Sequence, residues 1–203
     1  MALFNRSFVL SRATKILNEN FNGRYSAESI AIESAYKQSS QEAAKIQIFD
    51  IFLSHSYMDK KGALGIRNIL ENDFNYSVYI DWIEDSDLDR SNVSSVTAKR
   101  IRERMIKCKC LFYATSTNAS TSKWMPWETG LMDGLKNRVA ICPFIDNAET
   151  DNFFGQEYLG IYPYVTINSA QGTNTDYLWI RKNINTYVRF DFWLNGQEPS
   201  IHQ

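Results

Sequence analysis

The chain has 203 residues, with 22 basic and 23 acidic side chains and a formal net charge of −1. A balance this close to neutral gives no extended positive surface for nucleic acid or for an anionic membrane. Hydrophobic residues make up 44% of the chain and aromatic residues 14%, a composition typical of a globular protein with a sizeable core. No run approaches the ~18 apolar residues of a membrane span, and the start of the chain is a poor secretory signal. We therefore expect a soluble, cytoplasmic protein with no nucleic-acid or membrane partner.

The first 45 residues follow a different pattern from the rest of the chain. Apolar side chains at helical spacing predict a helix at Phe8, Val9, Ala13, Ile16 and Leu17. A second helix is predicted over residues 26–47, where Ser26 opens a segment with a narrow apolar stripe. Neither segment holds candidate chemistry. We expect residues 1–45 to form an N-terminal helical extension and residues 46–203 to form one α/β domain.

Beyond residue 46, short apolar runs alternate with helical stretches. Runs rich in β-branched and aromatic residues predict strands at residues 46–55, 76–82, 110–116, 138–145 and 162–168. Helical periodicity predicts helices at residues 59–73, 94–108, 122–137 and 173–194. Gly62 and Gly65 weaken the prediction of the first of these helices. Ser94 or Ser95 is the expected cap of the second. The last helix is expected to bury Trp179, Ile180, Ile184 and Val188.

This alternation predicts the fold class. Strands that alternate with helices imply a parallel sheet with helices on both faces. The strands of such a sheet are buried on both sides, which accounts for runs as apolar as "CLFYA" and "VAICPF". We expect an α/β, flavodoxin-like parallel sheet of about five strands.

The three cysteines, Cys108, Cys110 and Cys142, fall in or beside these apolar runs. An odd count argues against a disulfide framework, so we interpret them as reduced, buried thiols. The two histidines, His55 and His202, have no neighbouring cysteine pair of the kind that binds zinc. No metal site is expected.

Polar side chains follow the predicted strands at the point where each ends. In an open parallel sheet, ligands bind outside the carboxyl ends of the strands. The first strand is followed by "SHS", the second by an acid-rich loop, and the third by a loop that leads to "SKWMPWETG". The resulting candidates are Ser54, His55, Ser56, Asp81, Trp82, Arg90, Trp124 and Glu128. Glycine-rich phosphate-binding motifs and the GxSxG serine elbow are absent, which argues against Rossmann dehydrogenases, P-loop enzymes and serine hydrolases.

These segments resemble the boxes of Toll/interleukin-1 receptor (TIR) domains. "FDIFLSHSYMDK" resembles the first box, "VYIDW" the second strand with its aspartate, and "SKWMPWETG" the segment after the third strand. The resemblance covers roughly residues 46–190. This chain departs from the pattern of many bacterial TIR enzymes in the loop after the second strand. That loop often has a proline or glycine in those enzymes, and "IEDSDLDRSNVS" has neither.

The resemblance implies an activity. TIR enzymes cleave NAD+ at the nicotinamide–ribose bond and release nicotinamide with ADP-ribose or a cyclic isomer, and in bacterial antiphage defence of the Thoeris kind the product is a signal. It assigns the essential glutamate to Glu128 and, with an i, i+4 spacing, a ring-stacking role to Trp124. Pro126, between them, suits the first turn of a helix and loosens that spacing argument. NAD+ is then substrate rather than cofactor, and self-association and a downstream effector that senses the product are the implied partners.

The chemistry suits these residue types. Breaking the N-glycosidic bond builds positive charge on the ribose, which a carboxylate stabilises, while an aromatic wall excludes water. Ser54, His55 and Ser56 can bond ribose or phosphate oxygens, Asp81 and Trp82 lie beside the same rim, and Arg90 can meet a phosphate.

Other interpretations stay open at this point. Glu128 fits a solvated helix position, Trp127 fits a core anchor, and Trp124 fits core or pocket equally. His55 and Asp81 fit structural hydrogen-bonding roles. For the whole chain, the alternatives are a non-catalytic TIR-like interaction module and, more remotely, a nucleoside deoxyribosyltransferase-like enzyme.

Overall fold

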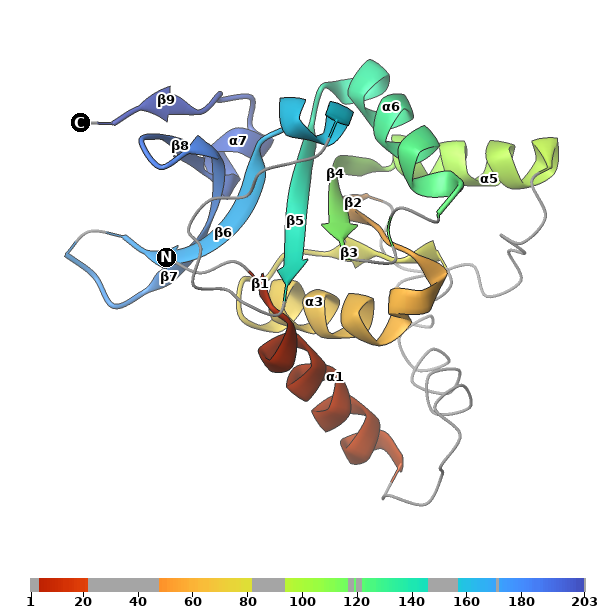
Figure 1. Ribbon diagram of the computed structural model, residues 1–203, viewed down its shortest axis with the longest axis horizontal. Helices are drawn as coiled ribbons and strands as arrows, with labels where there is room; N and C mark the ends of the chain where they lie inside the picture. The colour runs from red at the N-terminus through yellow and green to blue at the C-terminus, as the bar shows by residue number, and fades with distance from the viewer. Residues whose placement is uncertain are drawn as a thin grey trace.

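The computed structural model describes residues 4–21, 48–81, 94–116, 119, 122–145, 157–170 and 172–202 (Figure 1). Its elements in chain order are β1 (Phe4–Asn5), α1 (Arg6–Phe21), β2 (Phe49–Ser54), η1 (Tyr57–Asp59), α3 (Lys60–Asn72), β3 (Val78–Tyr79), α5 (Ser95–Ile106), β4 (Cys108–Thr115), α6 (Trp124–Lys136), β5 (Val139–Ile145), η3 (Glu157–Ile161), β6 (Tyr164–Ser169), β7 (Asp176–Asn183), β8 (Thr186–Arg189), α7 (Phe190–Leu194) and β9 (Ser200–Ile201). The predicted helix at 26–47 and the predicted boundary at residue 45 lie outside the described residues.

A single sheet runs through the described part of the chain in the order β3-β2-β4-β5-β6-β7-β8-β9, with β1 paired to β5. The strands from β3 to β6 are parallel. Their order is second, first, third, fourth, fifth, which is the flavodoxin-like arrangement. This confirms the predicted fold class, although β6, β7, β8 and β9 pair antiparallel and make the sheet larger than the five strands expected.

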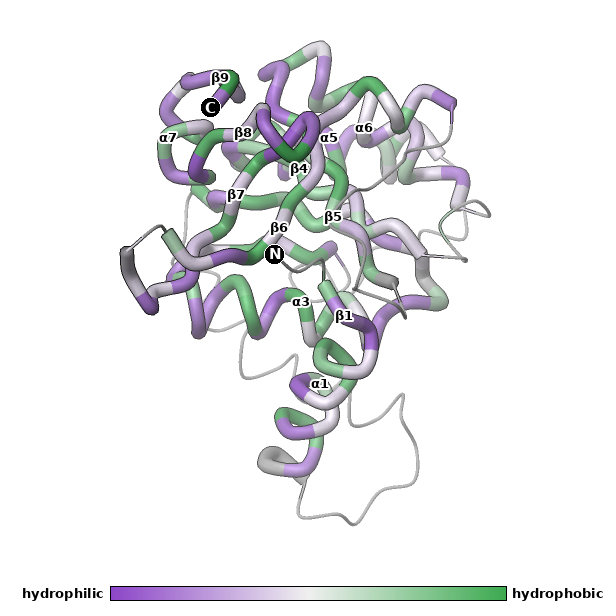
Figure 2. Tube along the Cα trace, turned by 60° about the vertical axis from the view of Figure 1, so that its left-hand side comes forward, coloured by the Kyte–Doolittle hydropathy of each residue, from purple (hydrophilic) through white to green (hydrophobic). Residues whose placement is uncertain are grey.

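Helices cover both faces of the sheet, as Figure 1 shows. One core layer lies between the strands and α1, α3 and α7, and it includes Val9, Ile51, Leu70, Phe112 and Phe190. The other lies under α5 and α6, and it includes Phe52, Ile101, Met125, Met132 and Ile141. In Figure 2 the hydrophobic residues gather in the central strands accordingly. Within the described ranges, no helix is long and apolar enough to cross a membrane.

The N-terminal helix docks directly on the main core. β1 pairs with the end of β5, and Val9 and Ala13 of α1 are fully buried. A Cβ on Gly65 would overlap the Val9 carbonyl oxygen and lie 2.8 Å from Val9 Cγ1. The glycine that weakened the sequence prediction of α3 is therefore the point where the backbone of α1 makes its closest approach.

The predicted helix over residues 173–194 is wrong. These residues form the hairpin β7–β8, followed by the short helix α7. Within β7, Leu178 and Ile180 are buried, whereas Tyr177 and Trp179 are only partly buried, so the true period is two. Trp179, Ile180, Ile184 and Val188 happen to fit a helical spacing as well, but Ile184 lies 47% exposed at the hairpin turn.

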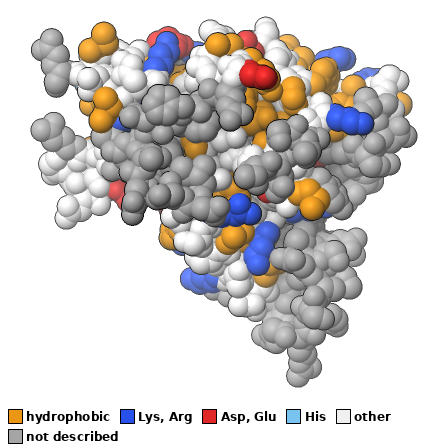
Figure 3. Space-filling model, viewed as in Figure 1, with side chains coloured by type: hydrophobic (Ala, Val, Ile, Leu, Met, Phe, Trp, Pro, Cys, Tyr) orange, Lys and Arg blue, Asp and Glu red, His pale blue; other side chains and the backbone are white. Residues whose placement is uncertain are grey.

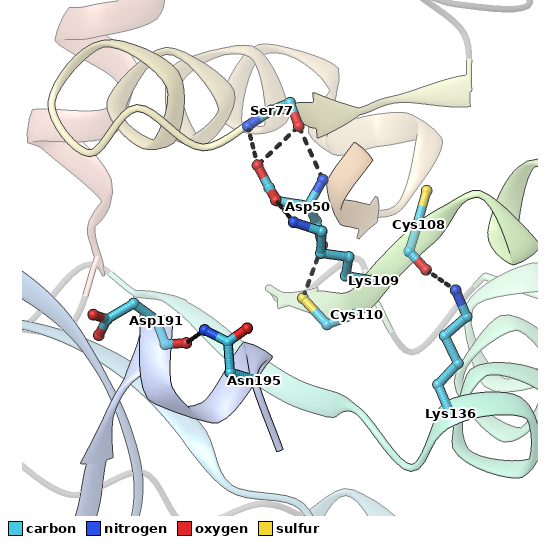
Figure 4. A network of polar contacts seen from close by, with 8 residues as sticks. All are labelled: Asp50, Ser77, Cys108, Lys109, Cys110, Lys136, Asp191 and Asn195. Atoms are coloured by element: carbon cyan, nitrogen blue, oxygen red, sulfur yellow. Dashed lines mark hydrogen bonds and ion pairs between the residues drawn. The ribbon is translucent and has the colours of Figure 1, made fainter. Parts of the chain in front are cut away.

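The amino end of the sheet is tied together by one carboxylate, shown in Figure 4. Asp50 of β2 accepts hydrogen bonds from the backbone N–H and the hydroxyl of Ser77, each at 2.9 Å, and forms an ion pair with Lys109 Nζ at 2.8 Å. Burial alone raises the pKa of Asp50, but the hydrogen bonds from Lys109 and Ser77 outweigh it and lower the pKa below its usual value. Asp50 joins β2, β4 and the start of β3 at the end opposite the candidate site.

The three cysteines are free and buried, as predicted. Burial raises the pKa of Cys108 to about 12 and raises those of Cys110 and Cys142 as well. Ser94 is the cap of α5, since its hydroxyl accepts from the Thr97 backbone N–H at 3.1 Å.

Candidate active site

A serine and a glutamate meet beneath α6 at the carboxyl end of β2. Ser54 is the last residue of β2 and Glu128 lies in the second turn of α6. The Ser54 hydroxyl donates to Glu128 Oε2 at 2.5 Å, and both residues have no exposed surface. β2 is the first of the five strands in chain order that form the parallel part of the sheet, and β3 and β4 lie on opposite sides of it. This is the topological switch point at which ligands bind in such sheets.

Trp124 and Glu128 lie on the same side of α6. The helix begins at Trp124, so Pro126 sits within its first turn and does not break the i, i+4 relation. Trp124 is 8% exposed and packs in the core layer under α6, while Trp127 is half-buried at the edge of that layer. The two indole rings contact edge to face, with centroids 5.5 Å apart. Trp124 is thus more deeply buried than Trp127, and it lies one helical turn before Glu128.

His55 and Ser56 continue from the end of β2 and are both buried. His55 Nδ1 lies 3.1 Å from the Leu53 carbonyl oxygen. Because a carbonyl oxygen only accepts, the His55 ring donates this hydrogen bond from Nδ1. Asp81, just beyond β3, is 1% exposed. The structure therefore places buried polar side chains at the carboxyl ends of the neighbouring strands β2 and β3.

A second hydrogen bond joins the same rim and was not predicted from the sequence. The Ser116 hydroxyl, just after β4, donates to Asp59 Oδ2 at the end of η1. Both residues follow strands in the sequence, and that position was the available signal. This bond ties the segment after β2 to the segment after β4, the two strand ends nearest Ser54.

Two predicted site residues, Trp82 and Arg90, lie outside the described residues. No cluster of three or more metal-ligating side chains occurs in the described portion of the chain.

A flavodoxin-like sheet with a buried, serine-held glutamate at its switch point defines an α/β domain built to bind a ligand at the carboxyl rim of its strands. No family model matches the chain. It is 43% identical over 194 residues to a protein of Bacillus cereus (strain MSX-D12) named "Probable 3' cyclic ADP-D-ribose synthase ThsB'", an alignment that covers 96% of this chain and 98% of that protein.

It is also 28% identical over 144 residues to a Cytobacillus dafuensis protein named "Putative cyclic ADP-D-ribose synthase TIR2", which covers 66% of this chain and 37% of that protein. The chain therefore belongs to the bacterial TIR family of the Thoeris, NAD+-consuming type, as the resemblance of its boxes implied.

Proposed function

We propose that this protein is a TIR-domain NAD+ cyclase, which cleaves the nicotinamide–ribose bond and releases nicotinamide and a cyclic ADP-ribose isomer as a signal in antiphage defence. The observation that carries the proposal is the buried carboxylate of Glu128, which lies on the helix after the third parallel strand and accepts a hydrogen bond from Ser54. It is supported by the 43% identity, over nearly the whole chain, to a protein named as a cyclic ADP-D-ribose synthase.

Glu128 is the proposed catalytic residue. As the bond to nicotinamide lengthens, positive charge develops on the ribose ring, and a carboxylate in a water-poor site stabilises that charge more strongly than water does. The departing ring takes the bonding electrons and leaves as neutral nicotinamide, so it needs no proton. The Ser54 hydrogen bond fixes one oxygen of the carboxylate and so orients the group.

Cyclisation requires the adenosine half of the molecule to displace nicotinamide in place of water. A hydroxyl of that half attacks the anomeric carbon, the new C–O bond replaces the C–N bond, and one proton is released, for which Glu128 is the proposed acceptor. We propose the 3′ cyclic isomer, because the Bacillus cereus relative, 98% of which aligns with this chain, carries that isomer in its name. A closed aromatic wall at Trp124 disfavours hydrolysis by excluding water.

The remaining rim residues are proposed substrate contacts. Ser54 ends β2, and His55 and Ser56 follow it; the three offer donors and acceptors for ribose and phosphate oxygens, and Asp81 follows β3. Trp82 and Arg90 complete the proposed set from the sequence alone. NAD+ acts here as substrate, and no separate cofactor is proposed.

The function is tested by incubating the purified protein with NAD+ and following nicotinamide and cyclic products by chromatography and mass spectrometry against 2′ and 3′ cyclic standards. We expect nicotinamide and the 3′ isomer in equal amounts. Glu128→Gln, which keeps size and hydrogen bonding, is expected to lower turnover about 100-fold or more, and the matched exposed variant Glu103→Gln on α5 is expected to leave it unchanged. Wild-type protein inactive at all concentrations would favour the non-catalytic module, and base exchange on a deoxynucleoside would favour the deoxyribosyltransferase alternative.

Self-association and a downstream effector remain part of the proposal. If copies complete each other's sites, specific activity rises with protein concentration. Turnover measured from nanomolar to tens of micromolar, beside sedimentation at the same concentrations, tests this. The effector is sought by adding the purified product, and not NAD+, to the candidate receptor.

A further inference from the structure

A buried tyrosine lies beside Ser54 on the face of the sheet that α6 covers. In the register of β2 and β4, Ser54 is paired with Tyr113. Paired residues on adjacent strands point to the same face with side chains in contact range. Tyr113 is 2% exposed and belongs to the core layer under α6. Tyr113 thus lies beside Ser54, the residue that bonds Glu128, on the face of the sheet that α6 covers.

The Tyr113 hydroxyl is held by the segment that precedes β6. It shares a side-chain hydrogen bond with Tyr158 of η3 and interacts electrostatically with the Glu128 charge. Burial, then Tyr158, then Glu128 raise the pKa of Tyr113 well above its usual value. Tyr113 therefore stays a neutral hydroxyl beside the carboxylate across the whole physiological pH range, and never adds a second negative charge there.

η3 is itself fastened to α6. Leu159 and Tyr162 pack on the core layer under this helix. The Tyr162 hydroxyl bonds the Asp133 side chain of α6, and burial with that bond raises the pKa of Tyr162 to about 12. In Figure 1 this short light-blue turn lies beside α6. Figure 3 shows hydrophobic side chains among polar ones over the same region, where Tyr158 is 39% and Ile161 is 71% exposed.

We propose that Tyr113 is a positioning residue for the Glu128 carboxylate, and that Tyr158 of η3 acts on Glu128 through Tyr113. Ser54 holds the carboxylate from β2, and Tyr113, held in turn from η3, supports it from β4. This inference rests on the proposed function for its role in turnover. Its geometry stands apart from that function, since it depends on the pairing of Ser54 with Tyr113, on their burial and on the bond to η3.

The test compares Tyr113→Phe, Tyr158→Phe and the double variant in nicotinamide release. We expect Tyr113→Phe to lower kcat about tenfold with KM changed less than twofold, because a polar hydroxyl near the reacting carboxylate is lost without loss of the binding surface. Its acid limb in kcat against pH is expected to move to higher pH, since a polar hydroxyl beside a buried carboxylate favours the charged form more than an apolar ring does. Tyr158→Phe is expected to cause a smaller change in the same direction.

The double variant separates positioning from simple packing. If Tyr158 acts through Tyr113, adding Tyr158→Phe to Tyr113→Phe changes kcat no further. Tyr76→Phe, a tyrosine on the opposite face that packs on Phe190, is the control and is expected to leave kcat and its pH profile unchanged. A Tyr113→Phe enzyme with wild-type kcat and a wild-type acid limb would overturn the inference for Tyr113. Additive effects of the two substitutions on kcat would overturn the claim that Tyr158 acts through Tyr113.

A readout without turnover keeps the two proposals distinguishable. The ¹³C signal of the Glu128 carboxyl, followed against pH in protein without NAD+, is expected to titrate at higher pH in Tyr113→Phe than in wild type, by about half to one pH unit. An inactive wild type that still shows this difference would reject the proposed function and keep the positioning role. An active wild type, with no difference between wild type and Tyr113→Phe in the kinetics or in the ¹³C titration, would keep the proposed function and reject the positioning role.

Discussion

At the scale of single residues, the bond from Ser54 to Glu128 makes the sharpest prediction. Ser54→Ala removes the donor that lies 2.5 Å from Glu128 Oε2 in a fully buried setting. We expect kcat to fall about 10- to 100-fold while the folded state is retained, because the carboxylate loses the group that orients it. Steady-state nicotinamide release and circular dichroism measure the two effects. Ser11→Ala, at an exposed hydroxyl of α1 that bonds only the Phe8 carbonyl, is the control. Equal activity of the two variants would contradict the prediction.

The cysteines make a second prediction at this scale. All three thiols are buried, and burial raises their pKa values, that of Cys108 to about 12. Thiolates are the reactive form, so we expect the native protein to react with a disulfide-exchange reagent far more slowly than free cysteine does. In 8 M urea, by contrast, three thiols per chain should react at once. Fast modification of even one thiol in native protein would contradict this.

Local sequence patterns predicted part of the site. The strand-end rule and the TIR boxes placed Ser54 and Glu128 near each other, and the structure joins them. The same reasoning missed Tyr113 and Tyr158. Tyr113 looks like one more apolar member of a buried strand, and Tyr158 comes from a distant segment without a motif. Their contact follows from strand register and from the docking of η3, which are tertiary properties that a local pattern does not contain.

At the scale of elements, two expectations from periodicity had opposite outcomes. The helix predicted at residues 94–108 was confirmed over Ser95–Ile106, where Ser94 caps it and the buried residues Ile101 and Met105 share one face, whereas Cys108 already belongs to β4. The helix at residues 173–194 was wrong, because a few apolar residues fitted both a 3.6-residue and a two-residue period. The β-branched and aromatic content of "DYLWI" and "TYVRF" was the better signal. For a short apolar segment, composition decided what periodicity left ambiguous.

The contact between α1 and α3 predicts how the N-terminal helix is held. Gly65→Ala places a methyl group against the Val9 backbone, which cannot move aside as a flexible side chain can. We expect it to lower the free energy of unfolding by about 1–3 kcal/mol, as overpacked cores do. Gly134→Ala in α6 is the matched control, since nothing lies within 4 Å of its Cβ. Alanine should raise helix stability there by about 0.5–1 kcal/mol. Urea unfolding measures both, and changes of the same sign would contradict the packing argument.

At the scale of the whole molecule, the two ends of the sheet carry different kinds of polar group. The carboxyl end gathers Ser54, Glu128 and Asp81, all buried, around the proposed reaction. The amino end holds the Asp50 carboxylate, which is bonded by Ser77 and Lys109 and serves to join strands (Figure 4). Because the two sets lie at opposite ends of β2, stability and catalysis can be changed separately. A variant at Asp50 should alter unfolding while leaving the carboxylate of Glu128 in place.

The acid dependence of stability follows from Asp50. Its pKa is lowered in the folded state relative to the ordinary value of 3.8, so the folded protein binds this proton less readily than the unfolded chain does. The stabilisation from Asp50 is therefore fully present above about pH 4 and is lost as pH falls through the lowered folded-state pKa.

Asp50→Asn, which removes the charge but keeps the shape, should be less stable than wild type at pH 7. That difference should shrink steadily as the pH is taken from about 4 toward 2. Urea unfolding across this range measures the difference, and Glu103→Gln, at an exposed position, should show almost none at any pH. A difference for Asp50→Asn that stays constant with pH would mean that the ionised carboxylate does not brace the sheet.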